Sequence, residues 1–98
     1  MTICILLYDR EEGALSIRTD NSPKGWFSTS TPDLIERAKS FIRRDDVNRN
    51  NSQEYISDTL DFWKDEIESG QIEYFEVNTE EELVSYLEDI LLIEELKK

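Results

Sequence analysis

The chain has 98 residues, a length that suits one domain built on a single small hydrophobic core. Its 23 acidic and 11 basic residues give a net charge of −12, and such a field repels nucleic acids and anionic membranes but attracts basic proteins. The chain has no histidine, one cysteine and no glycine-rich phosphate loop. These absences exclude histidine-dependent catalysis, ordinary structural zinc sites, disulfides within the chain and P-loop chemistry.

We expect no signal for secretion or membrane insertion in this chain. The apolar run at residues 3–8 is too short for a signal peptide and has no basic segment before it. No other stretch approaches the roughly 20 apolar residues of a membrane-spanning helix. We therefore expect a cytoplasmic protein without a membrane partner, in which Cys4 is a buried core thiol.

The first quarter of the chain predicts a β-hairpin followed by a short strand. Residues 3–8 are apolar throughout, which is typical of a strand buried on both faces at the centre of a sheet. Residues 15–19 alternate between apolar and polar side chains and follow a turn that contains Gly13. Trp26 and Phe27 begin the predicted third strand, and we expect both rings to pack in the core.

The next predicted element is an amphipathic helix that begins at Thr31 and Pro32, which suit the N-cap and first helical positions. Its apolar stripe consists of Leu34, Ile35, Ala38, Phe41 and Ile42. Its outer face carries Arg37, Lys39, Arg43 and Arg44. In so acidic a chain, four bases are a weak indication of nucleic-acid binding, and we expect them to offset nearby acids.

Residues 51–70 predict one helix with two distinct faces. Ile56, Leu60, Trp63 and Ile67 fall on a buried face, with Trp63 as its packing anchor. Five acids recur on the opposite face at spacings of 4, 3, 4 and 3, over roughly 20 Å at about 1.5 Å per residue. We call this set the acidic ridge; it consists of Glu54, Asp58, Asp61, Asp65 and Glu68.

The acidic ridge carries a local energetic cost. Each pair of like charges three or four residues apart on a helix costs about 0.2–0.5 kcal/mol, so the predicted helix loses on the order of 1–2 kcal/mol. Lys64 is the one base within residues 50–96, a stretch that contains fifteen acids. A local rule broken without compensation is typical of functional surfaces, although a solvated face in an acidic protein gives the same pattern.

The last third of the chain predicts a strand and a helix. Residues 72–77 form the strand, and Thr79 with Glu82 forms a capping box that opens the helix. The helix buries Leu83, Tyr86, Leu87, Ile90 and Leu91. Its second acidic row consists of Glu81, Glu88 and Glu95. Leu92 and Leu96 fall on the polar side, where they are candidates for self-association. We expect the protein to be a monomer or a weak homodimer.

These elements predict a single α+β domain over residues 1–98, in the order β-β-(β)-α-α-β-α. The predicted domain is a small antiparallel sheet, made of the N-terminal hairpin and a late strand, packed with three helices. With the helices on one face of the sheet, the acidic ridge would point outward. No motif that is diagnostic of a known family occurs in the sequence.

The charge distribution favours an acidic interaction module without a cofactor, metal or catalytic residue. Two rows of carboxylates at helical pitch resemble a track of phosphates, which predicts binding to the basic groove of a nuclease or another nucleic-acid-binding protein. Tyr55 and Phe62 lie seven residues apart beside the acidic ridge and are the predicted interface anchors. By analogy of size and charge, this pattern suits an immunity protein or a phage anti-defence protein, such as an anti-CRISPR protein.

Two other functions fit the same sequence. One is a non-enzymatic adaptor or regulatory subunit that binds through an apolar patch, with acidity serving solubility only. The other is a small-molecule-binding or catalytic domain with a pocket near Trp26 and the polar segment at residues 45–50. The salt sensitivity of partner capture separates the first of these from the charge-mimic hypothesis.

Overall fold

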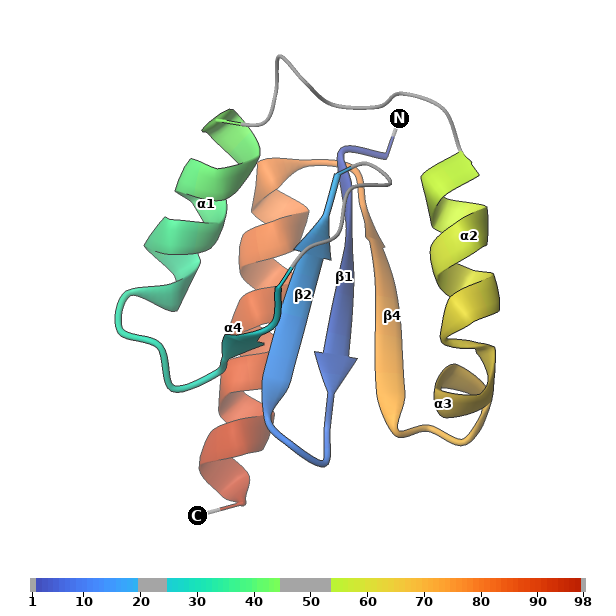
Figure 1. Cartoon of the computed structure of the whole chain (residues 1–98). Helices are drawn as coiled ribbons and strands as arrows, with labels where there is room; N and C mark the ends of the chain where they lie inside the picture. The colour runs from blue at the N-terminus through green and yellow to red at the C-terminus, as the bar shows by residue number, and fades with distance from the viewer. Residues whose placement is uncertain (1, 20–24, 45–53, 98) are drawn as a thin grey trace.

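The computed structural model describes residues 2–19, 25–44 and 54–97, and within them it contains a four-stranded antiparallel sheet (Figure 1). The strand order is β3-β2-β1-β4, and β1 pairs with β2 and β4 along its length. The strands are β1 (Cys4–Asp9), β2 (Ala14–Arg18), β3 (Phe27–Ser28) and β4 (Ile72–Val77). This arrangement confirms the predicted α+β class and the central position of the first strand.

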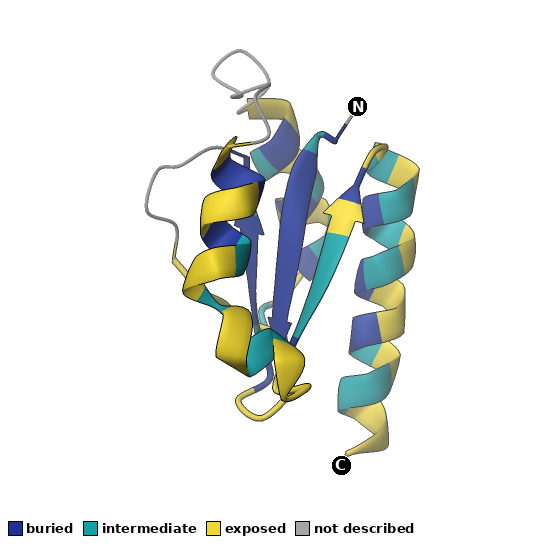
Figure 2. Ribbon diagram, turned by 90° about the vertical axis from the view of Figure 1, so that its right-hand side faces the viewer, coloured by how far each residue is buried: buried dark blue, intermediate teal, exposed yellow. Residues whose placement is uncertain are grey.

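Helices cover both faces of the sheet, whereas the sequence predicted three helices on one face. The described residues contain α1 (Leu34–Arg44), α2 (Glu54–Phe62), α3 (Lys64–Glu68) and α4 (Glu80–Leu96). In Figures 1 and 2, α4 lies on one face of the sheet and α2 on the other, while α1 packs beside α4. The apolar run of β1 explains this arrangement, because a strand with two apolar faces needs cover on both.

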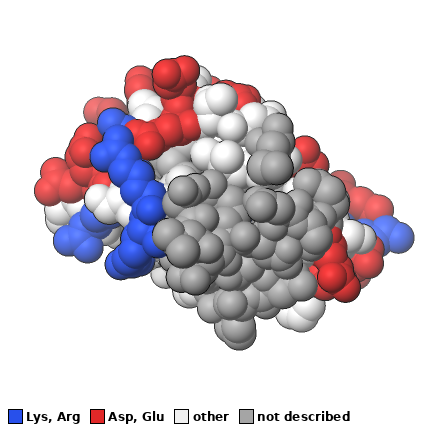
Figure 3. Space-filling model, turned by 90° about the horizontal axis from the view of Figure 1, so that it is seen from above, with Lys and Arg blue, Asp and Glu red and all other residues white. Residues whose placement is uncertain are grey.

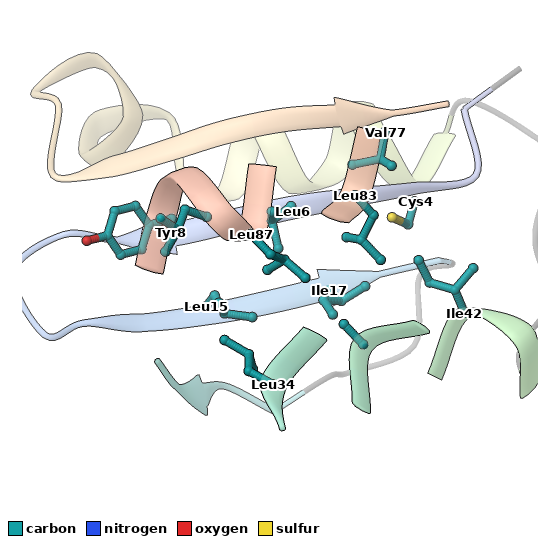
Figure 4. Packing of buried hydrophobic residues seen from close by; sticks show 12 residues of the cluster. Cys4, Leu6, Tyr8, Leu15, Ile17, Leu34, Ile42, Val77, Leu83 and Leu87 are labelled. Carbon is teal, nitrogen blue, oxygen red and sulfur yellow. The ribbon is translucent and has the colours of Figure 1, made fainter. Parts of the chain in front are cut away.

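The main core lies between the sheet and the α1–α4 pair (Figure 4). Cys4, Leu6 and Tyr8 alternate along β1 and point into this core, where each is fully buried. The opposing helices contribute Leu34, Ala38 and Ile42 from α1 and Leu83, Leu87 and Ile90 from α4. The predicted burial of the Cys4 thiol and of these six helical residues is therefore confirmed. Ile35, Phe41, Tyr86 and Leu91, which belong to the same predicted stripes, are only partly buried.

A smaller core lies on the other face of the sheet. It consists of Ile5 from β1 with Tyr55 and Ile56 from α2, and Leu60 and Tyr74 pack against it. Because β1 side chains alternate between the faces, Ile5 lies opposite the main core. The smaller core holds α2 against the sheet and thereby determines which side of α2 faces solvent.

Two of the predicted helix boundaries are confirmed and one is wrong. Thr79 is the N-cap of α4, since its hydroxyl accepts a hydrogen bond from the Glu82 amide at 3.1 Å. Gly70 ends the helical segment with a φ of 84°, a conformation that glycine adopts without strain. The helix predicted from Thr31 instead begins at Leu34, after Asp33 takes a positive φ of 57°.

Trp26 and Phe27 are less buried than the sequence predicted. Their exposed fractions are 36% and 37%. Phe27 belongs to β3, which is a two-residue strand at the edge of the sheet. An edge strand has a neighbour on one side only, so rings at this position keep part of their surface in solvent.

Candidate interaction surface

The outer side of α2 presents three acids of the acidic ridge. Glu54, Asp58 and Asp61 are exposed, while Tyr55 and Ile56 are buried against the sheet. The α2 segment of the ridge is therefore a solvent-facing surface with an apolar underside, as predicted.

The predicted single helix over 51–70 is wrong, because the helical segment breaks at Trp63. Residues 51–53 lie outside the described part of the chain, α2 ends at Phe62, and α3 starts at Lys64. Trp63 has φ and ψ of −103° and 20°, and Figure 1 shows α3 turned away from the axis of α2. The break separates Asp61 from Asp65, which removes one of the like-charge contacts of a continuous helix.

The acidic ridge therefore consists of two parts that do not form one straight row. Asp65 and Glu68 are exposed on α3, as the other three acids are on α2. The α2 part runs from Glu54 to Asp61, seven positions apart, or about 10 Å at about 1.5 Å per residue. One strand of duplex DNA carries about three phosphates over that rise.

Three aromatic side chains meet at the break. The Trp63 ring lies 5.5 Å from the Trp26 ring and 5.0 Å from the Phe62 ring, both edge to face. Trp63 itself is half-buried, so its predicted role as the central packing anchor is wrong. Phe62 has an exposed fraction of 76%, which leaves a large apolar side chain in solvent beside Asp58 and Asp61.

The structure separates the two predicted interface anchors. Phe62 is exposed as expected, but Tyr55 is 1% exposed and belongs to the smaller core. Helical projection centred the buried face on Ile56, Leu60 and Trp63, whereas contact with Ile5 and Tyr74 rotates that face toward Tyr55. The prediction that Tyr55 is an interface anchor is therefore wrong.

The second acidic row lies on a different side of the molecule. Glu81, Glu88 and Glu95 are exposed along α4. Because α4 and α2 cover opposite faces of the sheet, the second row and the acidic ridge do not merge into one surface (Figure 2). Leu92 and Leu96 on the same helix are exposed by 58% and 77%, as the sequence predicted.

Basic residues gather on a third side. In the view from above, Lys and Arg atoms form a band on the α1 side with acidic atoms along its flank (Figure 3). Arg43 reaches from α1 to Glu80 at the start of α4, with Nη2 2.6 Å from Oε1 and Nε 3.1 Å from Oε2. Lys39 lies 3.5 Å from Glu36. Arg43 and Lys39 thus form ion pairs with nearby acids, as expected.

A polar cluster that the sequence did not predict ties the end of α4 to the first hairpin. The Tyr8 hydroxyl donates to the Glu94 carboxylate, and Lys97 Nζ lies 2.6 Å from Glu94 Oε2. The Thr29 hydroxyl donates to the Gly13 carbonyl at 2.7 Å. Burial disfavours the charged form of Glu94, but the hydrogen bonds that Lys97 and Tyr8 donate to it outweigh burial and lower the pKa of Glu94. Burial and the nearby Glu94 carboxylate together raise the pKa of Tyr8.

Replacing Gly13 by alanine should lower the free energy of unfolding by about 1–3 kcal/mol. Gly13 has a φ of 66°, which strains any residue with a Cβ, and the added Cβ would push the Glu94 carboxylate out of its present position. Gly70→Ala is the matched control, since Gly70 also has a positive φ, of 84°, but its added Cβ meets nothing within 4 Å among the described residues. Denaturant unfolding of both variants measures the difference, and equal stabilities would contradict the structural role of this cluster.

Buried polar atoms also occur beneath the α2–α3 side. Ser16 Oγ, Arg18 Nε and Trp63 Nε1 are buried without a hydrogen-bond partner among the described residues. Burial lowers the pKa of Arg18. A buried polar group that stays unpaired costs about 1–3 kcal/mol.

Neither a metal site nor a membrane segment occurs in the described part of the chain. Among residues 2–19, 25–44 and 54–97, no three carboxylate or thiol groups gather in a way that would hold a metal ion. No helix in these ranges is both long enough and apolar enough to cross a bilayer. Comparison of the chain with known protein families, curated proteins and solved structures found no match.

Proposed function

We propose that this protein is an acidic interaction module that inhibits a basic nucleic-acid-binding protein. The partner is a nuclease or a related defence or toxin protein, and the α2 surface occupies the groove that otherwise holds phosphates. The protein has no catalytic role in this proposal and works in the cytoplasm as an immunity or phage anti-defence protein. It binds neither nucleic acid nor membrane directly.

The observation that carries this proposal is the exposed ring of Phe62 within an acidic surface. The Phe62 side chain is 76% exposed, and aromatic rings are typical anchors of protein interfaces. Asp58 and Asp61 flank it on the same helix, and Asp65 follows the break. The α2 surface thus combines an apolar anchor with charges of one sign.

This combination gives binding two separable contributions. The carboxylates attract a basic groove over long range and speed up association, an effect that added salt weakens. The Phe62 ring loses water only in the bound complex, so it acts mainly on dissociation. A surface that used charge alone would lose nearly all of its affinity at high salt.

A pull-down from cell lysate across a salt series tests the proposal. The protein as bait should capture a basic nucleic-acid-binding protein, and rising salt should release it. Adding the purified protein to that partner should then inhibit its binding or cleavage of nucleic acid. Capture of a partner that is neither basic nor salt-sensitive, with nucleic-acid activity unaffected, would contradict the proposal.

One observation favours the alternative function, an adaptor that binds through an apolar patch. Leu92 and Leu96 are exposed by 58% and 77% on one side of α4, away from the α2 surface. In that case Leu92→Glu would abolish partner capture while neutralising the acids of α2 would leave it intact. The charge-mimic function predicts the reverse pattern for the same two variants.

A further inference from the structure

A groove runs between α1 and the edge of the sheet. It has a volume of about 350 Å³, and its floor includes the buried Ile17 and Leu34. Phe27 and Phe41 are partly exposed along it, so the groove presents apolar surface to solvent. Its charged lining consists of Arg37, Arg44 and Glu36, all exposed, so the groove carries a net positive charge.

Within the part of the chain that the structure describes, these two arginines make no ion pair, unlike Arg43 and Lys39 of the same helix. Arg43 pairs with Glu80 and Lys39 with Glu36. Within the described ranges no acid lies at salt-bridge distance from Arg37 or Arg44, and the Arg44 guanidinium instead lies 5.6 Å from the centre of the Phe41 ring. Among the described residues, Arg37 and Arg44 are thus two cations without an ion pair beside a partly apolar groove, which fits an acidic and apolar occupant.

The outer side of α4 has the complementary pattern. Glu88, Leu92 and Glu95 stand at positions i, i+4 and i+7, the spacing of Arg37, Phe41 and Arg44 on α1. Each charge pair therefore spans about 10 Å along its helix, at about 1.5 Å per residue. All three α4 residues are exposed, and Leu96 extends the apolar row by one turn.

The same chain cannot bring these two surfaces together. The α4 helix packs on the core through Leu83, Leu87 and Ile90, and Leu92 projects roughly 180° from that buried face at about 100° per residue. The outer row of α4 therefore faces away from its own sheet and from its own groove. Contact between the two surfaces requires a second copy.

We propose that the α1 groove of one copy receives the C-terminal half of α4 from a second copy. Arg37 and Arg44 pair with Glu88 and Glu95 of the second copy, and Leu92 and Leu96 cover the apolar floor. The contact joins two different surfaces, so each copy can offer its helix while its own groove accepts another. The second acidic row is partly covered in this assembly, whereas the α2 surface stays accessible.

Sedimentation velocity of the full chain across a concentration series tests the contact. Wild type should associate at high concentration and less so at high salt, because the ion pairs lie in a partly exposed contact. Two double variants remove the ion pairs: the first is Arg37→Glu with Arg44→Glu, and the second is Glu88→Arg with Glu95→Arg. At low salt, each should associate at least about tenfold more weakly than wild type. Circular dichroism confirms that each variant is folded.

Two further comparisons separate the specific contact from net charge. The second variant carries less net charge than wild type, so charge repulsion alone predicts stronger association where the proposal predicts weaker. Combining all four reversals restores the wild-type charge and should restore association, as should mixing the first and second variants. A wild type that stays monomeric at every concentration would overturn the proposal. So would a second variant that associates as strongly as wild type. The proposal also fails if neither the fourfold variant nor the mixture of the two variants restores association.

Discussion

Replacing Tyr55 by alanine should lower the free energy of unfolding by about 3–5 kcal/mol, a large share of the roughly 5–15 kcal/mol that holds a typical domain folded. Tyr55 is 1% exposed and is the largest side chain of the smaller core, where it packs with Ile5 and Ile56. Its removal leaves a cavity between α2 and the sheet that neighbouring groups fill only in part. Equilibrium denaturant unfolding measures the loss.

Phe62→Ala is the matched control, since it truncates an aromatic ring of the same helix. Because that ring is 76% exposed, its removal should cost less than about 1 kcal/mol. It should weaken partner binding, whereas Tyr55→Ala should act through stability. Equal stability losses for Tyr55→Ala and Phe62→Ala would mean that α2 is rotated relative to the orientation described here.

Changing Asp58, Asp61 and Asp65 together to asparagine should slow association with the basic partner by about tenfold or more at low salt, while stability holds or rises. Asparagine keeps the shape of each side chain and removes its charge. The like-charge contact between Asp58 and Asp61 costs about 0.2–0.5 kcal/mol, and its loss sets the size of any gain. Stopped-flow association and denaturant unfolding measure the two effects.

A second triple variant controls for the change in net charge. Glu11→Gln, Glu12→Gln and Asp89→Asn also remove three charges from exposed positions, but none of these residues lies on α2 or α3. This control should associate with the partner nearly as fast as wild type, because the charges nearest the contact act most strongly at physiological salt. If both triple variants associate equally slowly, the acidic ridge is only a solvated face.

Much of the fold was predictable because its signals are local. The strand at residues 72–77 is bounded by Gly70 and by the capping box of Thr79 and Glu82, and its predicted ends match β4. The apolar run of β1 likewise predicted a central strand. The same run indicated that both sheet faces need cover, although the prediction placed all helices on one face.

The details of the candidate surface depend on contacts that the sequence does not reveal. Tyr55 is buried by Ile5 and Tyr74, which lie far away in the chain, so helical projection alone assigned it to the wrong side. The break at Trp63 accompanies ring contact with Trp26, across a long stretch of sequence. The pairing of Tyr8 with Glu94 joins residues 86 positions apart and leaves no local pattern.

Competition between this protein and duplex DNA for the captured basic partner tests the central claim most directly. In a titration of the partner bound to labelled DNA, wild-type protein should displace the DNA completely. The variant with Asp58, Asp61 and Asp65 changed to asparagine should displace the DNA only at a concentration at least about tenfold higher. The matched triple variant should behave like wild type. A stable ternary complex, in which the partner holds the DNA and this protein together, would contradict the claim that the α2 surface occupies the phosphate-binding groove.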